Sequence, residues 1–442
     1  MKHTLRGVVL VLLLGPLGLG QSRSAAQWRA DLASLADALT HRHMNFFAHL
    51  SQDDFNTAVT TLDSSIPSMT DSQIRAALAR LVALGQDSHT YLDISSASRR
   101  FGFIATHFDN GWYLTATGLG NSDKIGYRLL ALGGVDADSL PDLVAPFISH
   151  DNRAWLIRNT GAYLSLEDIL SAAGLLTSNG TVILDLQALD GSNLSLELAP
   201  ASAIPFITAD YTVASLPYYR QRPYDYYWYQ YDAPTRLLYI RYRVCAEEPG
   251  TPAYPFWQEV LSVFDQNRVD RLVIDYRDNG GGDDSIIDPL MWGLRDRFSK
   301  LGNPTRLYAL TNDGTFSSAL LDVSAFKEAE VMMGVPFIRI VGQPTGGNPN
   351  SYGNVYTYQL PNSGLYYQLS TRYFGMMFKE DSLQPDILIP LRSDQYFSGQ
   401  DPVLDAIVSG NADSQSVAPR PAGMPNRPKA LVRRPVSPSP LR

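Results

Sequence analysis

The sequence has 442 residues, of which 45% are hydrophobic and 18% are charged, and its net charge is −8. This length and apolar content predict two or three packed domains and exclude a disordered chain. The segment 411–442 is rich in Pro, Ser and Arg and carries a charge of +5. Without this segment and without Lys2, Arg6 and Arg23 near the N-terminus, the body of the chain carries about −16. Because nucleic-acid binding depends on positive charge, we expect no nucleic-acid partner. We expect 411–442 to be a disordered tail.

The N-terminus has the order of a secretory signal, in which Lys2 and Arg6 precede an apolar run over 8–14. Two pairs of small residues follow that would suit signal peptidase, Gly18 with Gly20 and Ser24 with Ala26. The run is too short for a stable membrane span. We therefore expect a signal peptide over 1–26 and a secreted or periplasmic protein. An uncleaved anchor is the alternative.

The first part of the mature chain, 27–99, is predicted to be helical. Apolar residues recur there at helical spacing, at Trp28, Leu32, Leu35 and Leu39. Over 100–200 the pattern changes to short alternating strands and turns, which predicts a small β-rich module.

The region 201–410 alternates strands with helices. Strands are predicted at 237–244, 271–276, 305–310 and 337–341, and helices at 256–266 and 317–329. This alternation is typical of an α/β domain with a largely parallel sheet. The tyrosine-rich segment 218–242 is expected to pack within strands, with a ligand-stacking platform as the alternative. The single cysteine, Cys245, ends a strand, so we expect it to pack in the core.

A glycine-rich turn follows the strand at 271–276. Gly280, Gly281 and Gly282 leave the backbone free to aim several N–H groups at one point, where they could stabilise an oxyanion. A phosphate-binding loop would need Lys and Ser or Thr next, whereas Asp283 and Asp284 follow.

Two further segments carry candidate catalytic side chains. Ser317 lies at the predicted start of a helix, where a serine is most often only an N-cap. His89 stands at the boundary between the helical region and a strand. His41, His43 and His49 lie on a polar helical stretch and are expected to be solvated, and no set of residues forms a convincing metal site.

Five segments together resemble the C-terminal-processing (tail-specific) serine peptidases and their tricorn-core and retinoid-binding relatives. Residues 275–282 resemble the D-L-R-x-N-x-G-G signature of that family, and 315–319 resemble its T-x-S-A segment. Residues 87–90 resemble D-G-H-T, 342–347 resemble G-E-x-T-x-G, and 384–387 resemble V-x-P-D-I. Their order matches from about residue 28 to 407.

The resemblance implies a crotonase-like ββα-superhelix catalytic domain over 201–410, after a helical N-terminal region. It also implies that the β-rich module is of the PDZ-like kind. Many members use a lysine base about 25 residues after the serine, but Gly342 and Asn348 occupy the corresponding places here. Lys327 is ten residues from Ser317 on one predicted helix, about 15 Å away, and cannot be the base.

The tricorn branch instead uses His, Glu and an accessory Ser, which fall on His89, Glu380 and Ser88. Ser317 would then attack a peptide carbonyl and His89 would take its proton, while Glu380, directly or through Ser88, would orient the imidazole.

The amides of Gly281 or Gly282 and of Ser318 would hold the oxyanion. No metal or organic cofactor is implied, and the partners would be peptide or protein substrates. The alternatives are a non-catalytic binder of apolar ligands or peptides on the same fold, and an esterase using the same serine. No feature of the sequence fixes an oligomeric state.

Overall fold

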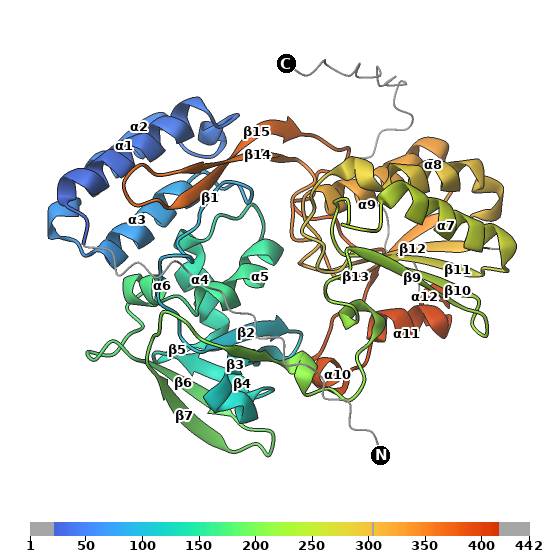
Figure 1. The fold of residues 1–442 in the computed structure, drawn as a ribbon, viewed down its shortest axis with the longest axis horizontal. Helices are drawn as coiled ribbons and strands as arrows, with labels where there is room; N and C mark the ends of the chain where they lie inside the picture. Colours follow the sequence, from blue (N-terminus) through green and yellow to red (C-terminus); the bar gives the residue numbers. More distant parts are fainter. Residues whose placement is uncertain (1–21, 303–304, 415–442) are drawn as a thin grey trace.

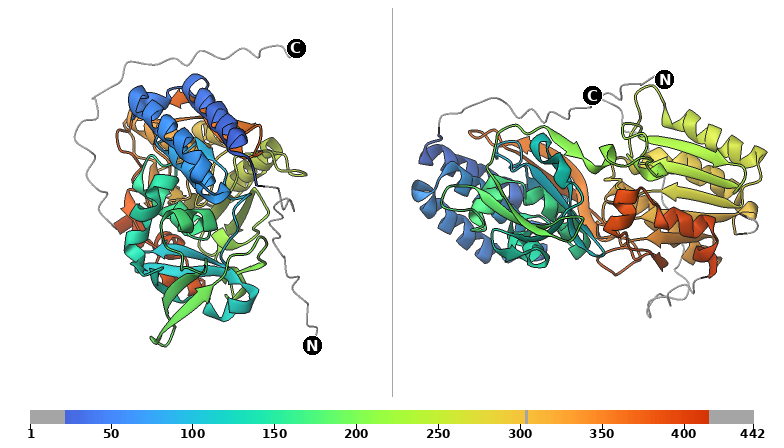
Figure 2. Two further views of the ribbon diagram at one scale, coloured as in Figure 1. Left: turned by 90° about the vertical axis from the view of Figure 1, so that its left-hand side faces the viewer. Right: turned by 90° about the horizontal axis from the view of Figure 1, so that it is seen from below.

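The structure is a computed structural model that describes residues 22–302 and 305–414. The expected signal residues 1–21 and the tail from 415 onward lie outside the described residues. The chain forms two lobes side by side, an N-terminal lobe of helices and a strongly twisted sheet and a C-terminal lobe built on a second sheet (Figures 1 and 2).

The N-terminal helices match the predicted helical region: α1 (Ala25–His41), α2 (Gln52–Ser65) and α3 (Asp71–Ala83). Each begins after a capping hydroxyl, from Ser24, Ser51 and Thr70 respectively, which accepts a hydrogen bond from a backbone N–H in the first turn. Because Ser24 and Gln27 form a capping box, the expected signal boundary at residue 26 falls inside the first turn of α1.

The β-rich module is an antiparallel sheet in the order β2-β3-β4-β6-β7, with β5 on β4 and β8 on β3. Its strands are β2 (Phe103–Phe108), β3 (Gly111–Gly118), β4 (Arg128–Leu132), β5 (Val135–Asp136), β6 (Val182–Gln187), β7 (Asn193–Leu198) and β8 (Phe206–Thr208). The sheet therefore extends beyond the expected boundary at residue 200.

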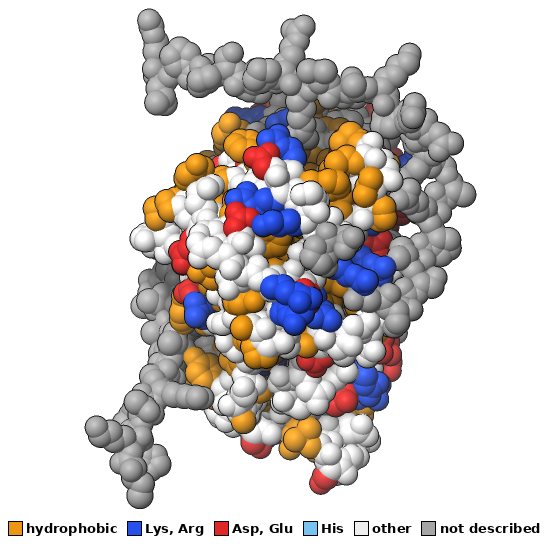
Figure 3. Space-filling model, turned by 90° about the vertical axis from the view of Figure 1, so that its right-hand side faces the viewer, with side chains coloured by type: hydrophobic (Ala, Val, Ile, Leu, Met, Phe, Trp, Pro, Cys, Tyr) orange, Lys and Arg blue, Asp and Glu red, His pale blue; other side chains and the backbone are white. Residues whose placement is uncertain are grey.

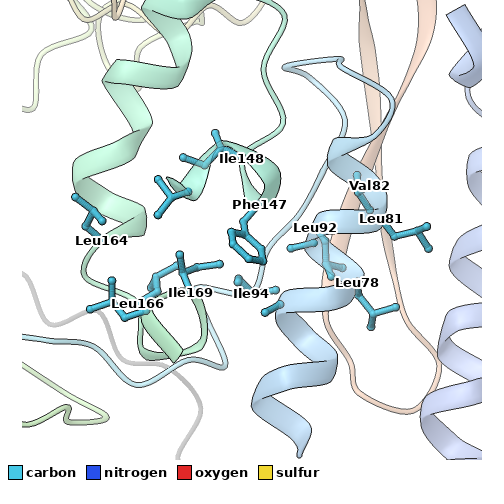
Figure 4. Close-up of a cluster of buried hydrophobic side chains, with 14 of the residues drawn as sticks. Leu78, Leu81, Val82, Leu92, Ile94, Phe147, Ile148, Leu164, Leu166 and Ile169 are labelled. Atoms are coloured by element: carbon cyan, nitrogen blue, oxygen red, sulfur yellow. The ribbon is translucent and has the colours of Figure 1, made fainter. Parts of the chain in front are cut away.

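Three helices connect β5 to β6: α4 (Leu140–Val144), α5 (Arg153–Tyr163) and α6 (Glu167–Ala172). Figure 4 shows apolar side chains of this segment meeting those of α3, with Phe147 and Ile169 on one side and Leu78 and Leu81 on the other. The helical region and the β-rich module thus share one hydrophobic core.

The C-terminal lobe contains a six-stranded sheet in the order β16-β13-β12-β11-β10-β9. The strands are β9 (Tyr227–Asp232), β10 (Leu237–Tyr242), β11 (Arg271–Asp275), β12 (Arg306–Thr311), β13 (Ile338–Gly342) and β16 (Ile387–Leu388). All neighbours except the edge pair β9–β10 are parallel, as the alternation of strands and helices predicted. The tyrosine-rich segment packs in that edge pair, with Tyr227, Tyr239 and Tyr242 buried.

Helices cover both faces of this sheet. One hydrophobic cluster joins it to α7 (Ala253–Gln266), α8 (Asp288–Asp296) and α9 (Ser318–Met333). On the other face lie α11 (Pro402–Val408) and α12 (Asn411–Ser414). The short helix α10 (Ser393–Ser398) precedes them, and its Tyr396 and Phe397 pack on Phe108 of the N-terminal lobe. Ala412 is fully buried and its carbonyl accepts a hydrogen bond from Arg339, so the expectation that the tail begins at 411 is wrong by a few residues.

A long hairpin joins the lobes. It consists of β14 (Ser351–Gln359) and β15 (Tyr366–Phe374), leaves the C-terminal lobe and lies against the N-terminal helices (Figure 1). There β15 pairs with β1 (Tyr91–Leu92), and the N–H groups of Asn362 and Ser363 at the hairpin tip donate to the Asp31 carboxylate on α1.

On the face in Figure 3, acidic and basic side chains alternate with hydrophobic ones, so neither sign of charge dominates it. No helix in the described part of the chain is long and apolar enough to cross a membrane. Within 22–302 and 305–414, no three His, Cys, Asp or Glu side chains are grouped so that they could hold a metal ion.

Candidate active site

Ser317 lies where the chain passes from β12 into α9. Its backbone has φ 52° and ψ −129°, in a region that a non-glycine residue rarely adopts. Two hydrogen bonds fix the residues before it, from the Phe316 N–H to the Asn279 carbonyl (2.9 Å) and from the Gly346 N–H to the Thr315 carbonyl (3.0 Å). Strain of this kind persists only where the surroundings impose it, and it concentrates at functional sites.

The glycine-rich turn after β11 packs directly against Ser317, because the carboxyl ends of the parallel strands β11 and β12 lie at the same edge of the sheet. A Cβ on Gly281 would lie 2.5 Å from the Cβ of Ser317, and one on Gly282 would lie 2.1 Å from the Cys245 carbonyl oxygen. Both glycines also have positive φ, 96° and 140°. A side chain at either position would therefore displace the serine or the neighbouring strand end.

Two of the three expected oxyanion donors remain free. The Gly281 N–H donates to Asn279 Oδ1 at 2.9 Å and is not available. The N–H groups of Gly282 and Ser318 have no partner within the described residues, and the Ser318 hydroxyl fixes their relative position by donating to the Gly282 carbonyl at 2.7 Å. The N–H of Ser318 also lies at the N-terminus of α9, where the helix dipole favours negative charge.

His89 comes from the other lobe, in the loop between α3 and β1. Its ring stacks on Phe316 with the centroids 4.3 Å apart, and Phe316 in turn stacks on Trp155 of α5 at 4.0 Å. Ser317 and His89 line one cavity of about 380 Å³ together with Gly282 and Ser318. Both ring nitrogens of His89 are buried and have no hydrogen-bond partner among the described residues, so no bond joins the imidazole to Ser317 in this state.

The carboxylate beside His89 is Asp87. Its Oδ1 accepts the His89 backbone N–H at 3.0 Å and lies 4.0 Å from the ring Nδ1. Its Oδ2 accepts from the Thr90 hydroxyl (2.6 Å) and from His43 Nε2 (2.9 Å). Because His43 Nδ1 accepts the Asn45 N–H, Nε2 is the protonated nitrogen of that ring. His43 is buried, and the expectation that it would be solvated is wrong.

These surroundings change the acidity of both groups. Burial alone would raise the pKa of Asp87, but the hydrogen bond from His43 and the nearby His89 bring this pKa below its ordinary value. Burial lowers the pKa of His89, and Asp87 offsets only part of that effect. His89 is therefore neutral at neutral pH and is able to accept a proton.

The structure does not place Glu380 and Ser88 as the resemblance implied. Glu380 is half-buried on the loop after β15, where its carboxylate accepts the Lys379 N–H at 3.1 Å, and it does not line the Ser317 cavity. The Ser88 hydroxyl donates to Asp151 Oδ1 at 2.6 Å. Neither side chain forms a hydrogen bond with the His89 ring, whose two nitrogens have no partner among the described residues.

Asp151 was not singled out from the sequence. Burial raises its pKa to about 7, and its Oδ2 is buried without a partner in the described chain. Nothing in the local sequence marks this carboxyl, since its pairing with Ser88 joins residues 63 positions apart.

Two other residues that could act as base or nucleophile are unsuited to the role, because Lys327 is ion-paired and Cys245 is buried. Lys327 forms ion pairs with Asp386 at 2.8 Å and with Glu330 at 3.2 Å. Cys245 is fully buried, and burial raises the pKa of its thiol, as expected for a packing residue.

No protein-family model and no curated protein sequence matches the chain. Solved structures do match, and they define the class by its fold, a two-lobed α/β protein similar to CPAF. The structure of mature CPAF complexed with lactacystin is 13% identical, with a TM-score of 0.61 over 88% of this chain and 98% of that chain. Mature CPAF matches with a TM-score of 0.59 at 13% identity over 89% and 99% of the two chains.

Photosystem II D1 C-terminal processing protease is 14% identical over 85% of this chain and 98% of that chain, with a TM-score of 0.39, too low to support an argument. The chain thus has the fold of CPAF along nearly its whole described length. This shared fold is consistent with the resemblance that the motifs indicated.

Proposed function

We propose that the protein is a serine peptidase in which Ser317 is the nucleophile and His89 the general base. One observation carries the proposal. A strained serine at a helix N-terminus shares a cavity with a buried neutral imidazole that has no other partner, beside two free N–H groups. The likeness to CPAF supports the fold on which these residues meet.

In the proposed reaction, the Ser317 hydroxyl attacks the carbonyl carbon of a peptide bond as His89 accepts its proton. The negative charge that develops on the carbonyl oxygen is stabilised by the N–H groups of Gly282 and Ser318. His89 then returns the proton to the leaving amine, which departs and leaves an acyl-enzyme on Ser317. Water, deprotonated by His89, hydrolyses that ester and restores the serine. Asp87 stabilises the transient imidazolium by its charge.

The test is active-site labelling combined with hydrolysis. A fluorophosphonate should label Ser317, and Ser317→Ala or His89→Ala should each remove nearly all cleavage of an unstructured protein substrate. The double variant should be little worse than either single one, because the two groups act as a unit. Lys327→Ala and Lys379→Ala are matched controls that should keep most activity.

Three outcomes would contradict the proposal. Retained activity in His89→Ala would rule out its role as the base. If Ser317 resisted the probe and no peptide or ester were cleaved, the chain would instead be a binder of apolar ligands or peptides. Hydrolysis of esters without amides would identify an esterase. We also propose, from the order of charged, apolar and small residues at the N-terminus, that the protein is exported.

A further inference from the structure

A second, larger cavity of about 970 Å³ lies between α8 and α9, beside the cavity that contains Ser317. We call it the α8–α9 groove. The two cavities share four lining residues, Asp284, Leu321, Arg372 and Phe374. The groove is therefore continuous with the space in which the carbonyl of a substrate would be attacked.

The walls of the groove are mainly apolar. They include Phe298, Phe326 and Phe337, and the small residues Ala325 and Ala329 face it from α9. Four of the nine methionines of the chain also line it: Met291, Met332, Met333 and Met376. Methionine side chains are flexible and polarisable, so such a surface adapts to apolar groups of different shapes.

The charged groups around the groove nearly cancel. Asp284, Asp288 and Asp322 line it together with Arg295 and Arg372. Burial beside neighbouring aspartates raises the pKa of Asp322, which disfavours its charged form. The groove consequently offers no strong attraction to a side chain of either sign. At its rim, Trp292, Met332 and Met333 expose 56%, 62% and 47% of their surface, an apolar area that a partner would cover.

We propose that the α8–α9 groove binds large apolar side chains on the acyl side of the scissile bond, a specificity that rests on the proposed peptidase function. The orientation of the bound peptide follows from the proton transfer. His89 must deliver a proton to the leaving amine, so the amine side lies toward His89, which does not line the groove. The acyl side then points to the α9 end of the cavity, past Leu321 and Phe374. The groove volume exceeds that of one side chain, so it accommodates more than one apolar residue.

The test uses acyl-peptide coumarin amides that differ only in the residue before the cleaved amide: Phe, Leu, Ala, Lys or Glu. We expect kcat/KM for Phe and Leu to exceed that for Ala by about tenfold or more, from the burial of additional apolar surface. Ala329→Trp should fill the groove and lower kcat/KM for Phe and Leu about tenfold while leaving the Ala substrate within about twofold. Val331→Trp, on the same helix but outside the groove, is the matched control.

Labelling of Ser317 by a fluorophosphonate distinguishes a failure of the groove assignment from a failure of the proposed peptidase function. Three results would overturn the groove assignment if labelling is normal: equal cleavage of all five peptides, a preference for Lys or Glu, or an equal loss of activity toward every peptide in Ala329→Trp. Each of them would leave the peptidase proposal intact. Absence of both labelling and cleavage in the unaltered enzyme would overturn the peptidase proposal itself.

Discussion

At the scale of single residues, the carboxylate that acts on His89 decides how the site responds to pH. Asp87 is 4.0 Å from His89 Nδ1, whereas Glu380 is bonded to a neighbouring backbone N–H. We predict that Asp87→Asn lowers kcat/KM by about 100-fold or more, and that Glu380→Gln lowers it by less than about tenfold. The comparison needs only steady-state kinetics on the two variants.

The pH profile gives a readout that a merely structural role for Asp87 would not move. Because burial lowers the pKa of His89, kcat/KM of the unaltered enzyme should rise with pH through an apparent pKa below 6.5. Asp87 raises that pKa by its charge, so in Asp87→Asn the midpoint should move to still lower pH. A midpoint that stays in place in Asp87→Asn but moves in Glu380→Gln would assign the role to Glu380.

Asp151 provides a prediction about stability. The folded state keeps its proton up to about pH 7, whereas the unfolded carboxyl ionises near its ordinary value of 3.8. Stability from this group is therefore present at pH 4 and is lost as the pH rises to 7. Between pH 4 and 8, Asp151→Asn should gain roughly 2–4 kcal/mol of unfolding free energy relative to the unaltered protein. Urea unfolding at both pH values measures this; a constant difference would mean that Asp151 titrates normally.

These residues also show which parts of the candidate site can be predicted from local sequence. Ser317, His89, Gly282 and Ser318 could be selected from the sequence because each lies in a short motif of adjacent residues, and the structure brings all four to one cavity. The bond between His43 and Asp87 spans 44 positions and depends on how a helix end packs, which no local pattern encodes. Glu380 was assigned by its position relative to a motif, but loop conformation, not sequence position, determines where its carboxylate points.

At the scale of elements, helix α5 holds both loops of the candidate site. Arg158 lies 2.9 Å from Asp278 in the glycine-rich turn and 3.7 Å from Asp313 in the serine loop. We predict that Arg158→Ala lowers kcat about tenfold by loosening both loops, with little change in melting temperature because the ion pairs are partly exposed. Arg158→Lys should keep only part of the kcat of the unaltered enzyme, because lysine lacks the planar guanidinium group that can bind both carboxylates.

Arg153 is the matched control on the same helix, because its exposed partner Asp142 is remote from the loops. Kinetics together with a thermal melt followed by circular dichroism separate the two effects. Equal activity losses in Arg153→Ala and Arg158→Ala, or a large drop in melting temperature for Arg158→Ala, would refute a specific positioning role.

The parallel sheet and the N-terminal helices followed from the sequence because periodicity and capping residues are local signals. The position of the hairpin β14–β15 could not be predicted, because alternation of apolar and polar residues indicates a strand but not the sheet that the strand joins. Likewise, β8 lies beyond residue 200, where the module was predicted to end, and was therefore assigned outside the sheet with which it pairs.

At the scale of the whole molecule, the contacts made by residues 23–26 bear on where a signal peptide could be cleaved. Arg23 donates to the carbonyls of Asn362 and Ser363 at the hairpin tip, and Ser24 caps α1. Cleavage after Ala26 would remove these contacts, at a cost of about 1 kcal/mol or more for the cap alone. We therefore propose cleavage after Gly20. Mass spectrometry of exported protein should find Gln21 as the first residue; Gln27, or intact Met1, would contradict this.

The hairpin also sets the order in which activity can appear during synthesis. The Gln368 side chain on β15 donates to the His89 carbonyl, a contact between residues 279 positions apart. Arg372 and Phe374, at the end of the same strand, complete the wall of the Ser317 cavity. A nascent chain that ends before the hairpin has both Ser317 and His89 but lacks the strand that fixes His89 and closes the cavity. Because such long-range contacts form slowly, we expect the proposed activity to appear only when synthesis of the chain is nearly complete.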